Sequence, residues 1–188
     1  MNIVVISGSR VGLKTQTATK KVTELIQEHY PEASLTLLDL KELDIVFSDG
    51  RNYLDYTGDT GYVTKTVMDA DVIFIGSPTF QCSIPATLKN IFDLLPENAL
   101  YHKTVAIIMT AGTPKHFLVA ETQLKPILSY MKANIVPNYV FIEDKDFILQ
   151  EIVNDDVLLR LETLVENTMV LARTYREIWR QQEESYDF

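Results

Sequence analysis

Short apolar runs alternate along this chain with longer stretches in which apolar residues recur every three or four positions. The short runs are continuous and rich in β-branched residues, and they predict β-strands at 3–6, 35–39, 72–75, 104–109 and 136–142. The periodic stretches predict helices, because apolar positions at that spacing fall on one face of a helix. Continuous apolar strands that alternate with helices are typical of a parallel sheet covered on both faces.

Helices are predicted at 15–30, up to about residue 69, at 86–95, at 115–132 and from about residue 155. Pro126 should kink the fourth of these helices, because proline lacks the N–H that an interior helical position needs. Residues 41–62 are the least regular part of the chain. We expect a long connection there that acts as a substrate or dimer element, with a solvent-exposed wrap as the alternative.

A polar loop with two prolines follows the third predicted strand, at residues 77–85. In an open parallel sheet, loops at the carboxyl ends of the strands line the ligand crevice. Proline fixes the backbone, Phe80 offers an aromatic face, and Thr79 and Gln81 offer polar groups. The loop favours a planar heterocycle as ligand, although an ordinary loop before a helix would look similar. Cys82 is interpreted as a small packing residue, since nothing nearby would activate its thiol.

The loop after the first predicted strand, residues 7–17, is basic and rich in hydroxyl groups. Backbone N–H groups at the start of the following helix lack partners and carry partial positive charge, which suits a phosphate. The side chains that would complete a phosphate cradle are Ser9, Arg10, Thr15 and Thr17. We therefore expect a phosphate monoester at this loop.

Two common phosphate motifs do not fit the same loop. A nucleoside triphosphate loop ends in Gly-Lys-Ser/Thr, whereas Lys14 is not preceded by glycine. A dinucleotide fingerprint needs three glycines, and this loop has only Gly8 and Gly12. Asp39, at the end of the second predicted strand, could still bind a ribose, although a turn or cap is the commoner role for such a residue.

The sequence resembles the NAD(P)H-dependent FMN reductase family, which includes quinone, azo-dye and chromate reductases of flavodoxin-like fold. The resemblance covers roughly residues 1 to 142 and rests on the first loop, on the proline loop followed by Leu88-Lys89-Asn90, and on the turn Thr110-Ala111-Gly112. The family pattern places the FMN phosphate at Ser9, Arg10, Thr15, Gln16 and Thr17. It places the flavin ring against Pro78, Thr79, Phe80 and Gln81, and closes its far side with Thr110, Ala111, Gly112 and Thr113. Members commonly have tyrosine, asparagine and glycine where this chain has Phe80, Gln81 and Thr113.

The resemblance implies an α/β fold, a flavodoxin-like three-layer αβα sandwich around a five-stranded parallel sheet of order 2-1-3-4-5. It implies one flavin-binding domain over residues 1–188, with a long C-terminal helix from about residue 155. The strand order reverses between strands 1 and 3, where the two loops should converge. A homodimer, or a tetramer, is implied by analogy alone.

The implied activity is hydride transfer from NADPH or NADH through FMN to a small-molecule acceptor: a quinone, an azo compound, a metal oxyanion or free flavin. No catalytic side chain is assigned, because a flavin carries this chemistry itself. Backbone N–H groups of residues 110–113 should stabilise the charge of the reduced flavin. The three histidines and single cysteine show no metal-ligand spacing, so we expect no metal site.

Composition limits the binding partners and the cellular compartment that we expect for this protein. The 17 basic and 26 acidic residues give a formal charge of −9, which argues against nucleic acid and anionic membranes as partners. No apolar stretch approaches the ~20 residues that span a bilayer, and the start of the chain lacks a signal-peptide pattern. One cysteine cannot form an internal disulfide, which fits a cytoplasmic protein. Two alternatives stay open: a Rossmann-type NAD(P)-binding enzyme without flavin, and a non-enzymatic flavodoxin-like electron carrier.

Overall fold

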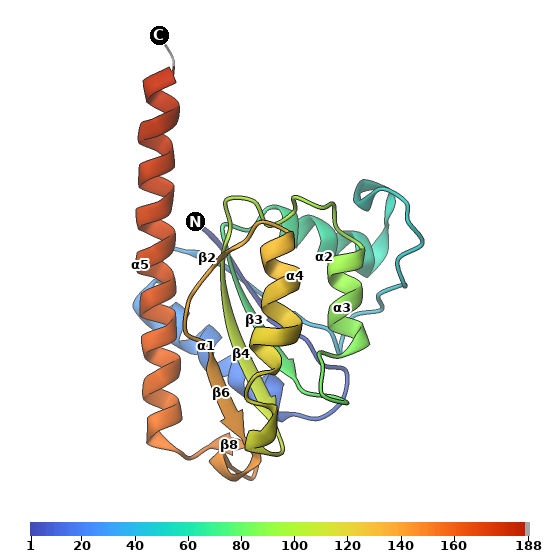
Figure 1. Cartoon of the computed structure of the whole chain (residues 1–188), viewed down its shortest axis with the longest axis vertical. Coiled ribbons are helices and arrows are strands. Elements are labelled where there is room, and N and C mark those ends of the chain that lie inside the picture. The colour runs from blue at the N-terminus through green and yellow to red at the C-terminus, as the bar shows by residue number, and fades with distance from the viewer. Residues whose placement is uncertain (187–188) are drawn as a thin grey trace.

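The computed structural model of the chain describes residues 1–186, and a parallel sheet lies at its centre (Figure 1). The strands are β1 (Asn2–Ser7), β2 (Ser34–Asp39), β3 (Val72–Pro78), β4 (Thr104–Ala111), β5 (Asn134–Ile135) and β6 (Val140–Glu143). They run in the order β2-β1-β3-β4, and both β5 and β6 pair with β4. All of these pairings are parallel. The predicted flavodoxin-like order 2-1-3-4-5 is therefore confirmed.

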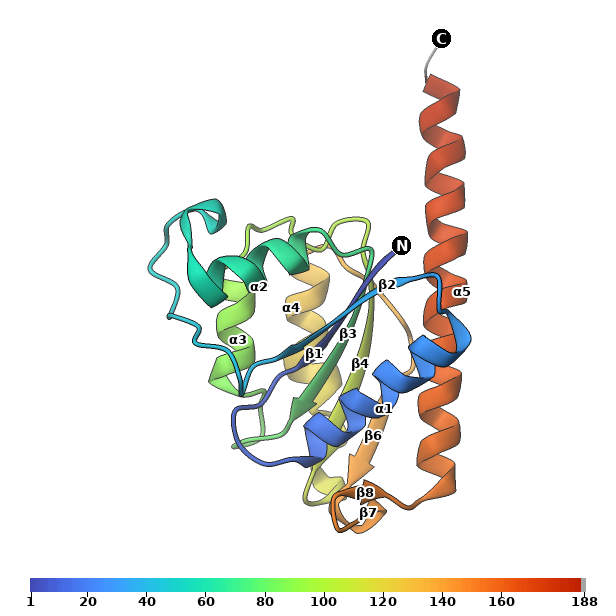
Figure 2. The ribbon, with the colours of Figure 1, turned by 180° about the vertical axis from the view of Figure 1, so that it is seen from behind.

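Helices cover both faces of this sheet, as Figures 1 and 2 show from opposite sides. The helices are α1 (Lys14–His29), α2 (Gly58–Met68), α3 (Ala86–Asp93), α4 (Lys125–Tyr130) and α5 (Asp155–Tyr186). Alternate side chains of a strand point to opposite faces. Ile3 and Val5 of β1 accordingly join an apolar cluster with α1 and α5, whereas Val4 and Ile6 join a second cluster with α2, α3 and α4. The result is the predicted three-layer sandwich.

The strand predicted at 136–142 is wrong in detail, because two short strands take its place. β5 pairs with the start of β4, and β6 pairs with the end of β4. Pro137 lies between the two short strands. Proline has no N–H to donate to a ladder, so it interrupts a strand at that point.

The helix predicted at 115–132 is also wrong as a single element. It consists of a 3-10 turn at Pro114–His116, a π-helical turn at Ala120–Leu124 and then α4. Pro126 is the second residue of α4, and the π-helical turn runs directly into this helix, because the Lys125 N–H donates to the Ala120 carbonyl. The kink expected at this proline therefore takes the form of a change in helix type immediately before it.

The connection after β2 is fastened to α3 by Asn90. The Asn90 side chain accepts a hydrogen bond from the Ser48 backbone N–H at 2.9 Å and donates one to the Val46 carbonyl, also at 2.9 Å. The motif residue Asn90 thus positions this connection. The Lys89–Asp93 pair, at 2.6 Å, lies within α3. A role for residues 41–62 at a substrate or dimer surface stays a prediction.

An antiparallel hairpin that the sequence pattern did not predict follows β6, and it pairs β7 (Phe147–Ile148) with β8 (Glu151–Ile152). Beyond the hairpin, α5 confirms the predicted long C-terminal helix, and its outer turns extend past the sheet (Figure 1). Among residues 1–186, no helix has both the length and the apolar character that crossing a membrane requires.

Gly76 lets α1 pack closely against β3, which gives a test of this arrangement. A Cβ atom at Gly76 would lie 2.3 Å from Thr19 Cγ2 on α1. We expect Gly76→Ala to lower the free energy of unfolding by about 1–3 kcal/mol, measured by urea denaturation, because the packed helix has little room to move. Thr19→Ser removes the opposing methyl group and keeps the hydroxyl. The double variant should therefore lose less than the sum of the single variants, and strict additivity would contradict this contact as the cause.

Candidate functional site

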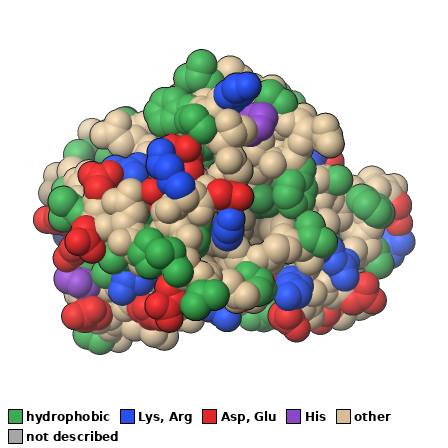
Figure 3. All heavy atoms as spheres, turned by 90° about the horizontal axis from the view of Figure 1, so that it is seen from below, with side chains coloured by type: hydrophobic (Ala, Val, Ile, Leu, Met, Phe, Trp, Pro, Cys, Tyr) green, Lys and Arg blue, Asp and Glu red, His purple; other side chains and the backbone are tan. Residues whose placement is uncertain are grey.

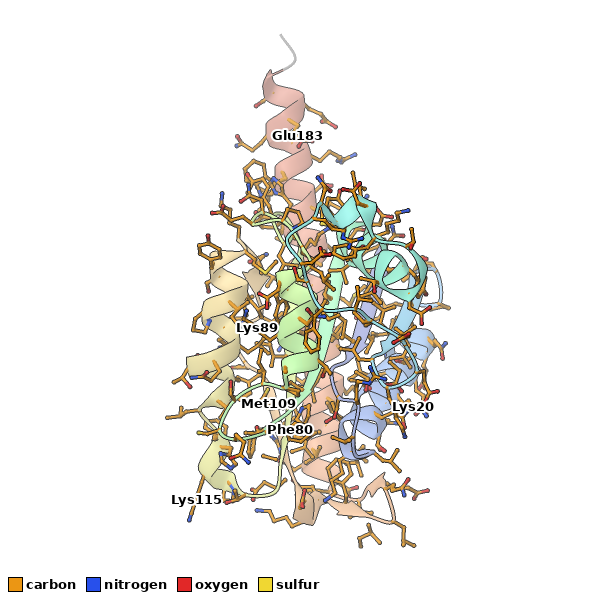
Figure 4. The ribbon with its side chains drawn as sticks, turned by 90° about the vertical axis from the view of Figure 1, so that its right-hand side faces the viewer. Lys20, Phe80, Lys89, Met109, Lys115 and Glu183 are labelled. Carbon is orange, nitrogen blue, oxygen red and sulfur yellow. The ribbon has the colours of Figure 1, made fainter. Side chains whose placement is uncertain are left out.

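Three loops meet at the carboxyl edge of the sheet, where the strand order reverses beside β1 and β3. They follow β1, β3 and β4, and Figure 3 shows the face that they form, with acidic and basic side chains next to one another. Phe80 lies at this end of the molecule, and Glu183 of α5 lies at the opposite end (Figure 4). Ligands of open α/β sheets bind at such a switch point.

The loops enclose a shallow pocket of about 230 Å³. Its lining consists of Val11, Gly12, Leu13, Lys14, Thr15, Pro78, Thr79, Phe80, Thr110, Ala111, Gly112 and Asp144. The structure thus brings together one predicted residue from the first loop, three from the proline loop and three from the loop after β4. The predicted residues that do not line the pocket are Ser9, Arg10, Gln16, Thr17, Gln81 and Thr113.

The first loop is held tightly against β3 and α3. The Gly8 N–H donates to the Gly76 carbonyl at 2.8 Å, and a Cβ atom at Gly8 would lie only 2.7 Å from that oxygen. The same Cβ would lie 3.1 Å from Leu88, the first residue of the Leu-Lys-Asn motif. The Ser9 hydroxyl donates to the Val11 carbonyl at 2.6 Å, so it shapes the loop from within.

Two buried hydroxyl groups connect the first loop to the third. Thr15 Oγ1 on α1 and Thr110 Oγ1 on β4 lie 2.7 Å apart. One hydroxyl donates to the other, which leaves the proton of the second hydroxyl for a further acceptor. Since both residues line the pocket, the pair presents one hydroxyl donor at the centre of the site.

Gln16 and Thr17 bind neighbouring parts of the chain. The Gln16 side-chain amide donates to Asp39, whose other carboxylate oxygen accepts from the Lys41 N–H at 3.2 Å. Asp39 is therefore a turn residue here, which weakens the alternative that assigned it to a ribose. The Thr17 hydroxyl donates to the Gln150 carbonyl at 2.9 Å and so anchors the β7–β8 hairpin to α1. A phosphate role for Gln16 and Thr17 stays a prediction.

The proline loop ends in a tight two-residue turn. Phe80 and Ser83 exchange backbone hydrogen bonds at 2.9 and 3.0 Å, and the residues between them, Gln81 and Cys82, have φ values of 48° and 61°. Positive φ at both central positions defines a type I′ turn, in which residues with side chains are strained. Cys82 is exposed at the tip of this turn. Its interpretation as a packing residue is therefore wrong, because the turn directs the side chain outwards.

Thr79 carries the clearest sign of a ligand. Its backbone N–H donates to the Thr110 carbonyl at 2.9 Å, which joins the second loop to the third. Its hydroxyl oxygen is buried and has no hydrogen-bond partner within the described residues. A buried polar group without a partner costs free energy, so such a group in a pocket points to a ligand that supplies the partner.

The turn after β4 is shaped by its own side chains. Thr113 accepts a hydrogen bond from the Lys115 N–H at 3.4 Å and caps the short 3-10 segment Pro114–His116. His116, a possible contact for cofactor or substrate, is half-buried and lies outside the pocket lining. Gly112 does line the pocket, and a Cβ atom there would lie 3.6 Å from Asp144 Oδ2.

Sequence reasoning did not assign Lys14 and Asp144 to the site. Their charged atoms lie 2.7 Å apart, and both residues line the pocket. Asp144 directly follows β6, whose carboxyl end reaches the same sheet edge as β1, β3 and β4. The sequence did hold a signal for Asp144, because the fifth strand was predicted to end at residue 142 and the residues after a strand end lie at this edge. The loop after that strand was not considered as part of the site.

Comparison with known proteins identifies the family. The sequence model of the NADPH-dependent FMN reductase family matches residues 1–147. An NAD(P)H-dependent FAD/FMN reductase of Geobacillus thermodenitrificans is 41% identical over 147 residues, which are 78% of this chain and 80% of that protein. An FMN reductase (NADPH) of Pseudomonas aeruginosa is 33% identical over 109 residues, 58% of this chain and 59% of that protein. The crystal structure of an NADH:FMN oxidoreductase in its apo form has the same fold, with a TM-score of 0.76 at 23% identity over 90% of this chain and 88% of that one.

The chain therefore belongs to the NADPH-dependent FMN reductase family. This membership makes it an oxidoreductase, and FMN and a reduced nicotinamide nucleotide are the cofactors of its family.

The strained turn gives a prediction for stability. Type I′ turns favour asparagine and then glycine at their central positions. We expect Gln81→Asn combined with Cys82→Gly to raise the free energy of unfolding by about 0.5–1 kcal/mol, because both new residues tolerate positive φ. Gln81→Val should lower it, since a β-branched residue is poorly accommodated there. Urea denaturation measures both effects, and a stabilising Gln81→Val would contradict the turn assignment.

Proposed function

We propose that this protein is an FMN-dependent NAD(P)H reductase that uses the pocket between the three loops as its flavin site and free flavin as its electron acceptor. The observation that carries the site is the Thr79 hydroxyl, which has no partner among residues 1–186 and belongs to a pocket at the switch point of the sheet. The choice of acceptor is supported by the two relatives whose names are those of flavin reductases.

The residues of the pocket fit FMN. The N-terminus of α1, which begins at Lys14, offers free N–H groups and a cation to a phosphate. Pro78 and the Phe80 ring offer flat apolar surface to the ring, and the Thr79 hydroxyl offers a hydrogen bond to one of its heteroatoms. Gly112 has no side chain, so it leaves the approach to the ring edge open. These residues come from three separate loops, and the two backbone bonds Gly8–Gly76 and Thr79–Thr110 hold the loops in register.

FMN, when bound, supplies hydride transfer between a nicotinamide and a second acceptor. The contribution of the chain is to bind and orient. The Thr15–Thr110 hydroxyl pair fixes the start of α1 relative to the end of β4. Backbone N–H groups of residues 110–113 would stabilise negative charge at the ring edge. Phe80 is 40% exposed, so this side of the pocket is open, and nicotinamide and acceptor can use it in turn.

Steady-state kinetics test the class and the acceptor together. NADPH and NADH oxidation would be followed with FMN, riboflavin, a quinone, an azo dye and a metal oxyanion as acceptors. We expect saturable oxidation with the highest kcat/KM for free flavin. A higher kcat/KM for the quinone, azo dye or oxyanion, in the presence of catalytic FMN, would show that this compound is the preferred acceptor. The protein would still be an FMN-dependent NAD(P)H reductase. The absence of FMN-dependent oxidation with either nucleotide would overturn the proposal.

Oligomerisation is a separate part of the proposal. A homodimer, or a tetramer, is expected from the family resemblance alone. Sedimentation analysis of the full chain decides between these states, and a monomer at micromolar concentration would contradict the expectation.

Thr79→Val should change stability and binding in opposite directions. In protein stripped of flavin, the variant removes a buried hydroxyl that lacks a partner, so we expect a free energy of unfolding higher by about 1 kcal/mol. The same change removes a hydrogen bond to the ring, so FMN and riboflavin should both bind several-fold more weakly. Denaturation and fluorescence titration measure the two effects. Unchanged flavin binding in a stabilised variant would contradict the assignment of Thr79 to the ring.

A further inference from the structure

An ion pair lies across the mouth of the pocket. Lys14 Nζ and Asp144 Oδ1 are 2.7 Å apart, and the two side chains are 40% and 54% exposed. Lys14 is the first residue of α1, and Asp144 follows β6, so the pair connects two walls of the pocket. Exposed pairs of this kind are weak, because water screens them. The contact can therefore be exchanged for a stronger one.

The backbone at Asp144 is held in place by the turn that carries it. Asp146, two residues further on, is buried and only 5% exposed. One of its carboxylate oxygens accepts from the Glu143 N–H at 2.9 Å, and the other accepts from the Asn154 side chain at 2.7 Å. These two bonds fix residues 143–146. The position of Asp144 at the pocket is thus a property of a rigid turn.

Lys14 is held by the same segment from a second side. Its ammonium group lies 5.7 Å from the centre of the Phe147 ring, at cation–π distance. The hairpin that begins at Phe147 is anchored on α1 by the bond from Thr17 to Gln150. Lys14 therefore faces a carboxylate and an aromatic ring from residues 144–147, at the end of α1 where a phosphate is expected.

We propose that Asp144 is a specificity-determining residue that competes with the flavin phosphate for Lys14. This inference rests on the proposed function, because it needs FMN in this pocket. A phosphate monoester carries more negative charge than a carboxylate, so it should draw Lys14 away from Asp144. The carboxylate that remains nearby then repels the phosphate. Asp144 therefore lowers the affinity for FMN, leaves riboflavin unaffected, and favours a flavin that exchanges with solution.

Fluorescence titration with FMN and with riboflavin tests this role in the full-length protein. We expect Asp144→Asn to tighten FMN binding about three- to tenfold. The substitution removes the weak ion pair that competes for Lys14, and it removes the repulsion between Asp144 and the phosphate. Riboflavin affinity should stay within about twofold, since riboflavin has no phosphate for this charge to act on. Lys14→Met should weaken FMN binding, and Asp144→Asn should then have a smaller effect in the Lys14→Met background.

Glu151→Gln is the matched control, because it removes one acidic charge from the hairpin that follows Asp144, at an exposed position outside the pocket lining. It should leave both affinities unchanged. Equal tightening by Glu151→Gln and Asp144→Asn would overturn the proposal in favour of a general charge effect, as would parallel changes for FMN and riboflavin. Asp144→Ser repeats the test if the asparagine variant does not fold. Wild-type protein that binds neither flavin would instead remove the proposed function itself.

Discussion

Parallel pairing of β1, β3 and β4 is the constraint on which the pocket depends. Ser7 pairs with Gly76, and Pro78 pairs with Thr110, so these strands end at closely matched levels. The sheet ladder continues into the loops through the Gly8–Gly76 and Thr79–Thr110 backbone bonds. The loops are therefore extensions of the sheet. Their positions are set by the same hydrogen bonds that hold the core together.

Hydrogen bonds also decide which polar groups of the site are available to a ligand. The hydroxyls of Ser9 and Thr17 are engaged by the chain, and those of Thr15 and Thr110 bind each other. Among the hydroxyls that line the pocket, that of Thr79 alone has no partner within residues 1–186. Because an unmet buried hydroxyl costs more than a satisfied one contributes, its presence in a pocket is a better indication of binding than the number of polar residues nearby.

The apolar pattern predicted a parallel sheet covered on both faces and the long C-terminal helix, because continuous β-branched runs are a strong signal. The strand order came from the family resemblance. It failed where one residue overrides a pattern. Pro137 divides the fifth strand, and the segment before Pro126 becomes a π-helical turn. Neither effect follows from periodicity, which averages over several residues.

Only some of the residues that line the pocket could be predicted from the sequence, and the reason is geometric. Residues that follow one another in a helix are rotated by about 100°, so Thr15, Gln16 and Thr17 cannot all face one pocket. The structure turns Thr15 towards β4, Gln16 towards Asp39 and Thr17 towards the hairpin. The sequence predicts that this turn of helix lies at the site. Which of its residues faces the pocket depends on how the helix is rotated against the sheet.

Charge in the pocket bears on how an acidic protein would select the anion that we propose as its ligand. The chain has a formal charge of −9, yet the only charged residues that line the described pocket are Lys14 and Asp144, which neutralise each other. Attraction for a phosphate therefore depends on the α1 N-terminus and on whether Lys14 leaves its partner. An electron carrier that must retain its flavin gains nothing from a carboxylate at this place. A reductase that releases reduced flavin does gain, since the repulsion that we propose for Asp144 would weaken flavin binding and speed flavin release.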